Sequence, residues 1–367
     1  MKIALVHDYL IDFGGAERVL VALHDIWPKA DVYLSIYNAE GLGETNKLFK
    51  NWKIKTSWFN KIPFNKRLIS PLRFLLPLVW RSFDFSEYDL VVSSSAWAMP
   101  KGIRTKGKTK HVCYCHTPPR FLYHYPEARK YTHYLPVRIY AAVINHFLRF
   151  YDYLTSQKVD LFVANSNQVA GRIRKFYKRE SVVVNPPIDL PKKISKSDKN
   201  YYLYISRLVS YKHPDLAAEA CGQLGVKLMI AGDGPLRSEV EELAKKYKNV
   251  EYLGRVSDNK LKELYENCKC LIYPVESEDF GMVPLEAAGF GKPTIAFYSG
   301  GAKETVIEGV SGLFCKDFSL ESLKNKIAEF EEKKYKFDSQ KIRLQAEKRS
   351  YSNFSKNILK AIKKVGR

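Results

Sequence analysis

Short apolar runs alternate with amphipathic stretches along almost all of the 367 residues. Runs of this kind, each followed by a stretch with helical periodicity, predict parallel strands joined by helices that cover both faces of a sheet. The predicted strands fall into two sets, Ile3–Val6, Leu90–Val92, His111–Cys115, Leu161–Ala164 and Val182–Val184, then Tyr202–Ile205, Lys227–Ala231, Val250–Leu253, Leu271–Tyr273 and Thr294–Phe297. Pro235–Tyr247 and Asn259–Cys268 are predicted helices of the second set. The pattern therefore predicts an α/β protein with two doubly wound parallel-sheet domains.

The boundary between the two sets is predicted at the proline-rich stretch Asn185–Lys193, which suits an extended connector. A chain of this length is also too long for one ordinary core. We expect domains over residues 1–187 and 188–350. Residues 351–367 are expected to form a C-terminal helix that can pack on either domain, for example back on the N-terminal domain.

The net charge of +21 requires an anionic partner to be considered, whether nucleic acid, an acidic membrane surface or a phosphorylated substrate. No helix-turn-helix, zinc-finger or RNA-binding signature accompanies the charge, so specific nucleic-acid binding is not expected. The apolar runs are too short to span a bilayer or to form a signal-peptide core, which predicts a cytoplasmic protein. The six cysteines lack Cys-x-x-Cys spacing and are expected to be buried, reduced thiols.

Residues 45–85 interrupt the first α/β pattern with aromatic residues, prolines and cations. The segment contains Trp52, Trp58, Phe59, Phe64, Lys66, Arg67, Arg73 and Arg81. Aromatic rings interleaved with Lys and Arg suit the headgroup layer of an anionic membrane. The same residues also suit an insertion that packs its own core. Both interpretations stay open at the level of the sequence.

Two motifs of the first half follow predicted strands. Gly14-Gly15 precedes an apolar-periodic helix, and a helix N-terminus without obstructing side chains presents N–H groups to an anion. His116 ends the strand His111–Cys115. A plain strand-to-helix turn and a structural histidine are the alternatives.

Three motifs of the second half lie where strands of an open sheet end. Arg207 and Lys212 follow the strand Tyr202–Ile205, at the edge where such sheets bind ligands, and the two cations suit a diphosphate. Gly232-Asp233-Gly234-Pro235 begins the next helix, with Pro235 in its first turn. Glu278 and Glu286 flank Phe280-Gly281-Met282-Val283, where a helix is expected to begin near Gly281 and to expose free amides. Two carboxylates at this spacing can hold two groups of hydroxyls. Downstream, Ser299-Gly300-Gly301 repeats the strand, double-glycine, helix arrangement.

Taken together, these motifs resemble the retaining glycosyltransferases of family 4 (group 1), in the same order and over nearly the whole chain. The resemblance implies the GT-B fold, in which two Rossmann-like domains face a central cleft. It implies that Gly15, Arg207 and Lys212 contact the diphosphate of a nucleotide sugar and that Glu286 holds the ribose. Glu278 and the amides of Phe280, Gly281, Met282 and Val283 would bind the transferred sugar, His116 would lie against that sugar, and Arg255 and Val256 would border the base. The catalytic contributions would come from His116, Arg207, Lys212 and Glu278.

No Asp-x-Asp motif occurs, so neither a metal nor another cofactor is expected. Ser206 and His213-Pro214 depart from the family pattern, because glycine is common after the phosphate-binding lysine. The stretch around His116-Thr117-Pro118-Pro119 is similar to mannosyltransferase-like members of surface-polysaccharide pathways. We therefore expect a hexose, with mannose from GDP-mannose favoured, to be transferred to a glycan or lipid-linked acceptor. The alternatives are a glucosyl- or N-acetylhexosaminyltransferase that uses a UDP-sugar, a sugar-nucleotide epimerase and, remotely, a nucleic-acid-binding protein.

Overall fold

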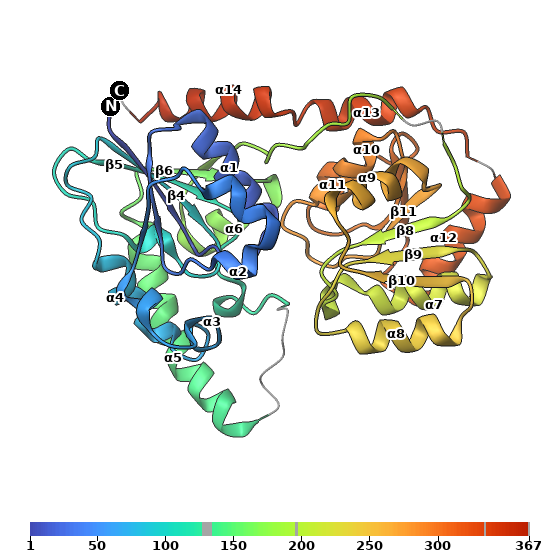
Figure 1. The fold of residues 1–367 in the computed structure, drawn as a ribbon, viewed down its shortest axis with the longest axis horizontal. Coiled ribbons are helices and arrows are strands. Elements are labelled where there is room, and N and C mark those ends of the chain that lie inside the picture. The colour runs from blue at the N-terminus through green and yellow to red at the C-terminus, as the bar shows by residue number, and fades with distance from the viewer. Residues whose placement is uncertain (127–133, 195–196, 334, 366–367) are drawn as a thin grey trace. The chain divides into compact units, whose positions relative to one another are not determined.

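The computed structural model describes residues 1–126, 134–194, 197–333 and 335–365, which form two compact units (Figure 1). Unit 1 contains Met1–Tyr125, Tyr131–Pro187 and Tyr351–Arg367. Unit 2 contains Ile188–Ser350 and, of the described residues outside that range, Pro126. The chain therefore leaves unit 1, builds unit 2 and returns to unit 1 for its last helix.

Unit 1 is built on a seven-stranded sheet with the order β3-β2-β1-β4-β5-β6-β7, in which all neighbours are parallel. Its strands are β1 Ile3–His7, β2 Asp31–Leu34, β3 Ile54–Thr56, β4 Leu90–Ser95, β5 Lys110–Cys115, β6 Leu161–Ala164 and β7 Ser181–Val183. Its helices are α1 Gly15–Ile26, α2 Ala39–Leu42, α3 Asn65–Leu68, α4 Leu76–Arg81, α5 Leu135–Ser156, α6 Asn167–Tyr177 and α14 Tyr351–Ile362. Every residue of the central strand β1 is buried, as expected for a strand covered on both faces.

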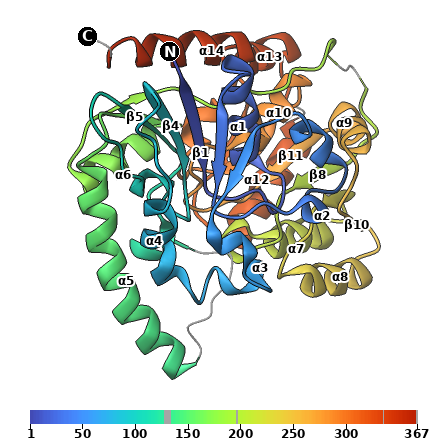
Figure 2. The same cartoon turned by 60° about the vertical axis from the view of Figure 1, so that its left-hand side comes forward.

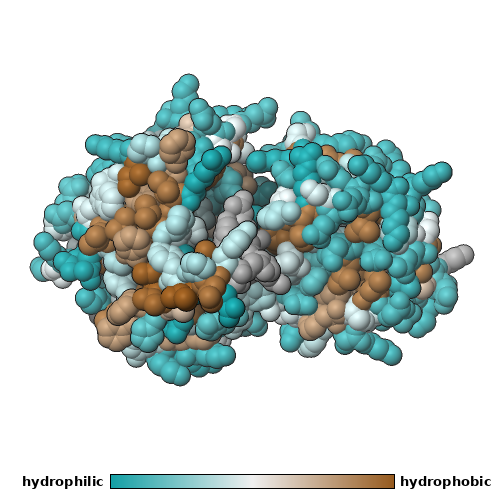
Figure 3. Space-filling model, turned by 90° about the horizontal axis from the view of Figure 1, so that it is seen from below, coloured by the Kyte–Doolittle hydropathy of each residue, from teal (hydrophilic) through white to brown (hydrophobic). Residues whose placement is uncertain are grey.

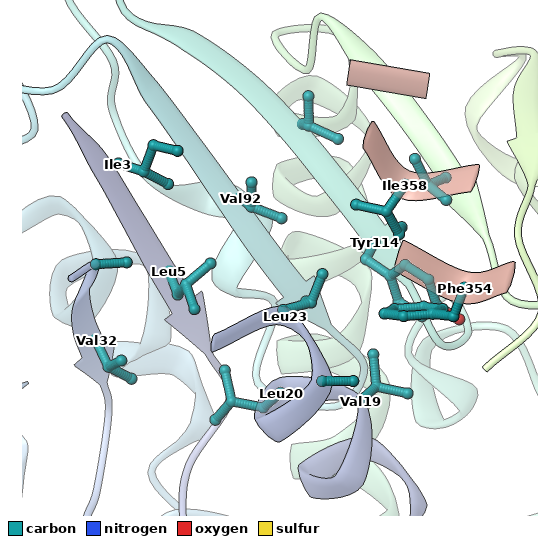
Figure 4. Close-up of a cluster of buried hydrophobic side chains, with 14 of the residues drawn as sticks. Ile3, Leu5, Val19, Leu20, Leu23, Val32, Val92, Tyr114, Phe354 and Ile358 are labelled. Carbon is teal, nitrogen blue, oxygen red and sulfur yellow. The ribbon is translucent and has the colours of Figure 1, made fainter. Parts of the chain in front are cut away.

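The C-terminal helix α14 completes the core of unit 1. Phe354 and Ile358 pack with Leu20 of α1 and Tyr114 of β5 in one cluster of buried side chains (Figure 4). The hydroxyl of Tyr351 donates a hydrogen bond to the carbonyl oxygen of Ala22 over 3.0 Å. Helices α4, α5 and α6 cover the opposite face of the sheet (Figure 2).

Unit 2 is built on a six-stranded parallel sheet with the order β10-β9-β8-β11-β12-β13. Its strands are β8 Tyr202–Ile205, β9 Leu228–Ala231, β10 Val250–Gly254, β11 Cys270–Tyr273, β12 Thr294–Phe297 and β13 Gly312–Cys315. Its helices are α7 Pro214–Leu224, α8 Arg237–Lys246, α9 Asp258–Asn267, α10 Met282–Gly289, α11 Ala302–Thr305, α12 Leu320–Lys333 and α13 Ser339–Glu347. One face of the sheet packs against α7, α8 and α12, and the other packs against α9, α10 and α11.

The two predicted doubly wound sheets are both present, although three strands were missed. Strand β2 and the edge strands β3 and β13 were not predicted, and β3 lies inside the segment 45–85, which is therefore not purely an insertion. Pro235 precedes α8 instead of lying in its first turn, because α8 begins only at Arg237. All six cysteines are buried and free.

The segment 45–85 divides its aromatic residues between the core and the surface. Phe59 and Trp80 are buried in the core on the α4 and α5 side, as one interpretation of the sequence expected. Trp58, Phe64 and Phe74 are exposed. Across the described residues, no helix combines the length and the apolar character that a membrane crossing demands.

Candidate active site

Both sheets have a topological switch point, which is the place where the order in which strands are added to the sheet reverses its direction. In unit 2 the switch lies between β8 and β11, which are neighbours in the sheet but not in the sequence. Arg207 and Lys212 follow β8, and Glu278 follows β11. The carboxyl ends of parallel strands meet at one edge, so the fold brings together two motifs that are about seventy residues apart in the sequence.

Lys212 and Glu278 form an ion pair at this edge. The Lys212 ammonium lies 3.3 Å from Glu278 Oε2, and both side chains are mostly buried, with exposed fractions of 17% and 14%. The Tyr273 hydroxyl donates a hydrogen bond to Glu278 Oε2 over 2.9 Å. Burial and the adjacent Glu278 raise the pKa of Tyr273 well above its usual value, so Tyr273 stays a neutral donor. The carboxylate of Glu278 is thus fixed from two sides.

Arg207 is exposed on the loop after β8, and a glycine turn supports that loop. A Cβ atom at Gly232 would overlap the carbonyl oxygen of Ser206, so only glycine permits this approach of the two backbones. The amide of Leu208 donates a hydrogen bond to the carbonyl oxygen of Asp233 over 3.0 Å. The motif Gly232-x-Gly234 therefore positions the loop that carries Arg207.

A second glycine turn supports the loop that carries Glu278. The amide of Gly301 donates to the carbonyl oxygen of Glu278 over 2.8 Å, and the amide of Ser277 donates to Ser299 Oγ over 3.0 Å. A Cβ atom at Gly301 would overlap the carbonyl oxygen of Phe280. The sequence pattern Ser299-Gly300-Gly301 serves close backbone packing here.

Helix α10 begins beside Glu278. Its N-cap residue Gly281 has φ 90°, a conformation that favours glycine, and the Phe280 side chain is buried against Ile188 and Leu285. The first amides of a helix have no partner within it, so those of Met282 and Val283 are available in the first turn. Further along α10, Glu286 Oε2 accepts a hydrogen bond from the Tyr265 hydroxyl over 2.7 Å. The N-terminus of α10 thus has the electrostatic character of an anion or hydroxyl site.

Arg255 and Val256 lie apart from this group. They follow β10, the edge strand, which is separated from β8 by β9. Arg255 is exposed, whereas Val256 packs partly into the core with Tyr265 and Leu253. The fold therefore brings Arg207, Lys212 and Glu278 to the switch point and leaves Arg255 and Val256 at the edge of the sheet.

The backbone explains how a histidine can stand at position 213, where the family commonly has glycine. His213 has φ 48°, in the left-handed region where glycine is normally found, and it is the N-cap of α7, in which Pro214 is the first residue. The backbone thus keeps the conformation that a glycine would favour. The Tyr204 hydroxyl also donates a hydrogen bond to the carbonyl oxygen of Lys212 over 2.9 Å.

In unit 1 a chain of polar side chains crosses the ends of β1, β4 and β5. Ser94 Oγ lies 2.9 Å from His7 Nδ1 and 2.8 Å from His116 Nε2, so one hydroxyl joins the two imidazole rings. Glu17 Oε1 lies 3.5 Å from His7 Nε2, and Glu17 Oε2 accepts a hydrogen bond from the amide of Gly14 over 2.9 Å. This chain links the glycine loop to His116. Gly15, the first residue of α1, is exposed beside it.

His116 is buried and its ring is held neutral. Burial, with a smaller contribution from His7, lowers the pKa of His116 to about 3. A neutral imidazole with one nitrogen engaged by Ser94 can offer only its other nitrogen to a ligand. Sequence reasoning found His116 but missed His7, Glu17 and Ser94. Two of them could have been found from the polar residues at the ends of apolar strands. His7 is the last residue of β1, and Ser94 lies in the run Ser93-Ser94-Ser95 of β4.

Replacing Ser94 by alanine is expected to destabilise unit 1 by about 1–3 kcal/mol, because two buried imidazole nitrogens lose their partner. Chemical denaturation measures this free energy of unfolding. Ser93→Ala is the matched control, since the buried Ser93 hydroxyl joins only one histidine, His111, over 2.8 Å. An equal or larger loss in the control would contradict the bridging role of Ser94.

Comparison with known proteins relates both units to glycosyltransferases. Residues 13–192 match the family model described as Glycosyltransferase Family 4, and residues 187–351 match the model described as Glycosyl transferases group 1. The α-1,3/1,6-mannosyltransferase ALG2 of Dictyostelium discoideum is 27% identical over 381 residues, which cover 87% of this chain and 88% of that protein. An uncharacterised glycosyltransferase of Methanocaldococcus jannaschii is 29% identical over 182 residues, and the match spans only 52% of that relative and 49% of this chain.

Solved structures show the same fold. HepE of Anabaena, crystallised with UDP and glucose, aligns with a TM-score of 0.72 and 22% identity over 99% of each chain.

Proposed function

Because the chain belongs to the family 4, group 1 glycosyltransferases and has the GT-B fold, we propose that it transfers a hexose, with retention, from a nucleotide diphosphate sugar to a glycan or lipid-linked acceptor. Mannose from GDP-mannose is the favoured donor, in keeping with the mannosyltransferase relative. A UDP-sugar is the alternative, in keeping with the UDP bound to HepE. We place the reaction at the inner face of the cytoplasmic membrane.

The observation that carries the proposal is the pair of Lys212 and Glu278 beside the N-terminus of α10. A cation suits the diphosphate, and a fixed carboxylate suits the hydroxyls of a sugar. In the proposed step the bond between the anomeric carbon and the diphosphate oxygen breaks, and its electron pair leaves with the diphosphate. The acceptor hydroxyl attacks the same face of the sugar and passes its proton to the leaving diphosphate. Arg207, Lys212 and the amides of α10 stabilise the charge that develops on the leaving group, so the proposal requires no metal.

The remaining residues are assigned within the same proposal. Glu286 binds the ribose, while Glu278 and the amides of Phe280, Gly281, Met282 and Val283 bind the transferred sugar. Gly15 approaches the diphosphate, neutral His116 donates to or accepts from the sugar, and Arg255 and Val256 border the base.

The thermal stability of the protein with GDP, UDP, ADP and their sugar conjugates tests the donor. A ligand at 100 times its dissociation constant adds about 2.7 kcal/mol of stability, which gives a clear rise in Tm. We expect GDP and GDP-mannose to give the largest rise. A larger rise in Tm with UDP would indicate a UDP-sugar as the donor. No rise in Tm with any nucleotide would contradict the proposed use of a nucleotide sugar.

An epimerase and a transferase differ in their need for an acceptor. An epimerase converts its nucleotide sugar in the absence of any second substrate. We expect the nucleotide sugar to remain unchanged when it is incubated alone, apart from slow hydrolysis. Accumulation of an epimeric nucleotide sugar would favour the alternative function.

The two glutamates are expected to have separate roles. Glu278→Ala should reduce sugar transfer sharply while nucleotide binding is largely retained, whereas Glu286→Ala should weaken nucleotide binding itself. Calorimetric titration with the free nucleotide, together with transfer kinetics, separates the two effects. Glu242→Ala, at an exposed position of α8, is the control. Identical defects in Glu278→Ala and Glu286→Ala would argue against separate sites.

A further inference from the structure

Helix α5 of unit 1 has an apolar outer face that no described part of the protein covers. Large apolar side chains recur every three or four residues along it, so they lie on one side of the helix. This α5 stripe consists of Leu135, Ile139, Val143, Phe147, Phe150 and Leu154, which are between 45% and 67% exposed. Patches of this kind on a folded protein mark interaction sites.

The opposite side of α5 already anchors the helix to unit 1. Leu148 is buried with Ile144 and Tyr151 in the same core as Trp80. Asp152 is fully buried and forms an ion pair with Lys101. The α5 stripe is therefore not needed to attach the helix, and a helix that is apolar on both sides is normally buried on both.

The exposed part of the segment 45–85 adjoins α5. Arg73 Nε donates a hydrogen bond to Asn145 Oδ1 over 3.0 Å, its guanidinium lies over the Tyr140 ring, and that of Arg81 lies over the Tyr151 ring. The segment 45–85 also has three exposed apolar side chains, those of Phe64, Phe74 and Leu78. Figure 3 shows apolar residues gathered on the underside of unit 1, the side to which α3, α4 and α5 extend in Figure 1.

In the part of the chain that the structure describes, the exposed charged side chains of residues 45–83 and of α5 are all positive. Between Glu44 and Asp84 the sequence has nine Lys and Arg residues and no Asp or Glu. Asp152 is the only acidic residue of α5, and it is buried. Lys66, Arg67 and Arg138 are exposed. A second copy of this chain would bring an equally basic surface against this one, whereas an anionic bilayer complements both the charge and the apolar side chains.

We propose that the α5 stripe, with Phe64, Phe74 and Leu78, inserts into the interfacial layer of an anionic membrane. The helix lies in the plane of the interface and does not cross the bilayer, and Lys66, Arg67 and Arg138 contact the lipid headgroups. This inference adds a membrane-binding surface to the proposed glycosyltransferase. It rests on the proposed function only for the reason why the protein would bind a membrane. A lipid-linked acceptor would be presented at the same surface.

Binding to vesicles tests the proposal without any substrate. We expect the full chain to bind vesicles of phosphatidylcholine with phosphatidylglycerol and to bind phosphatidylcholine alone at least ten-fold more weakly. The double variant Phe147→Ser with Phe150→Ser should bind the anionic vesicles about ten-fold or more weakly, because two rings no longer enter the interface. Co-sedimentation measures the partition coefficient.

The matched control replaces two exposed apolar side chains of unit 2, as Phe318→Ser with Leu344→Ser, and should bind like the parent. A second variant, Lys66→Gln with Arg67→Gln, should lose affinity for the anionic vesicles only. Unchanged vesicle binding by Phe147→Ser with Phe150→Ser would overturn the proposal. So would a dimer of the parent, seen by light scattering, that these two substitutions dissociate while vesicle binding stays intact.

Vesicle binding and the rise in Tm with a nucleotide test the membrane surface and the donor independently. The rise in Tm with the preferred nucleotide should be the same in the stripe variant and in the parent, because the α5 stripe belongs to unit 1 and the assigned nucleotide residues lie almost wholly in unit 2. Vesicle binding without a nucleotide response would refute the donor and leave the docking surface standing. A nucleotide response without vesicle binding would do the reverse.

Discussion

Replacing Lys212 by alanine is expected to lower the rate of sugar transfer at saturating donor by about 10²–10³-fold, and Arg207→Ala is expected to act in the same range. Either change removes a charge that meets the leaving diphosphate, and Lys212→Ala also leaves the mostly buried Glu278 carboxylate without its cation. Initial rates are to be measured with a metal chelator present throughout.

The control for this prediction is Lys248→Ala, which removes an equally flexible cation from an exposed position of unit 2. It should leave the rate unchanged. Full turnover of Arg207→Ala and Lys212→Ala in the presence of chelator would refute the electrostatic account. A parent enzyme that the chelator inactivates would show that a metal ion takes part.

Replacing Gly301 by alanine is expected to lower kcat/KM by about 10²-fold or more, although Gly301 is assigned no contact with a substrate. The new Cβ atom would overlap the carbonyl oxygen of Phe280, so the loop that carries Glu278 must move. A displacement of about 1 Å in a positioned group can cost about 10²-fold in rate. Transfer kinetics with the variant measure the effect.

Gly171→Ala is the matched control, because its Cβ atom meets nothing within 4 Å and the position lies inside helix α6. This change should preserve activity and add about 0.5–1 kcal/mol of stability. If Gly301→Ala kept full activity, the glycine turn would not position the sugar-binding loop.

The sequence was sufficient for the candidate site residues that lie close to the end of a central strand. The central strands were recognised because they are buried on both faces and read as continuous apolar runs, as in β1 and β11. Arg207, Lys212 and Glu278 could then be placed at one edge, because the carboxyl ends of parallel strands coincide.

What escaped prediction depends on long-range packing. β3 has only half-buried and exposed residues, so it lacks the apolar signal of a central strand. Ser94 and His7 contact each other across neighbouring strands whose pairing no local pattern reveals. Likewise, only the fold decides which apolar side chains of α5 are buried and which are exposed, since Leu148 on the inner side and Phe147 on the outer side are both strongly apolar.

The path of the chain through the two units has a consequence for synthesis. Apart from Pro126, the described residues of unit 2 come from one continuous stretch, Ile188–Ser350, which can complete its core while the following residues are still being added. Unit 1 receives Phe354, Ile358 and Ala361 only from α14, after the whole of unit 2 has been translated. During elongation the apolar side chains of α1 that pack with α14 therefore stay uncovered, although the strands of unit 1 emerge first. A ribosome that stops near residue 350 would leave a finished second unit joined to an incomplete first one, so the loss of α14 would damage the unit whose strands were made first.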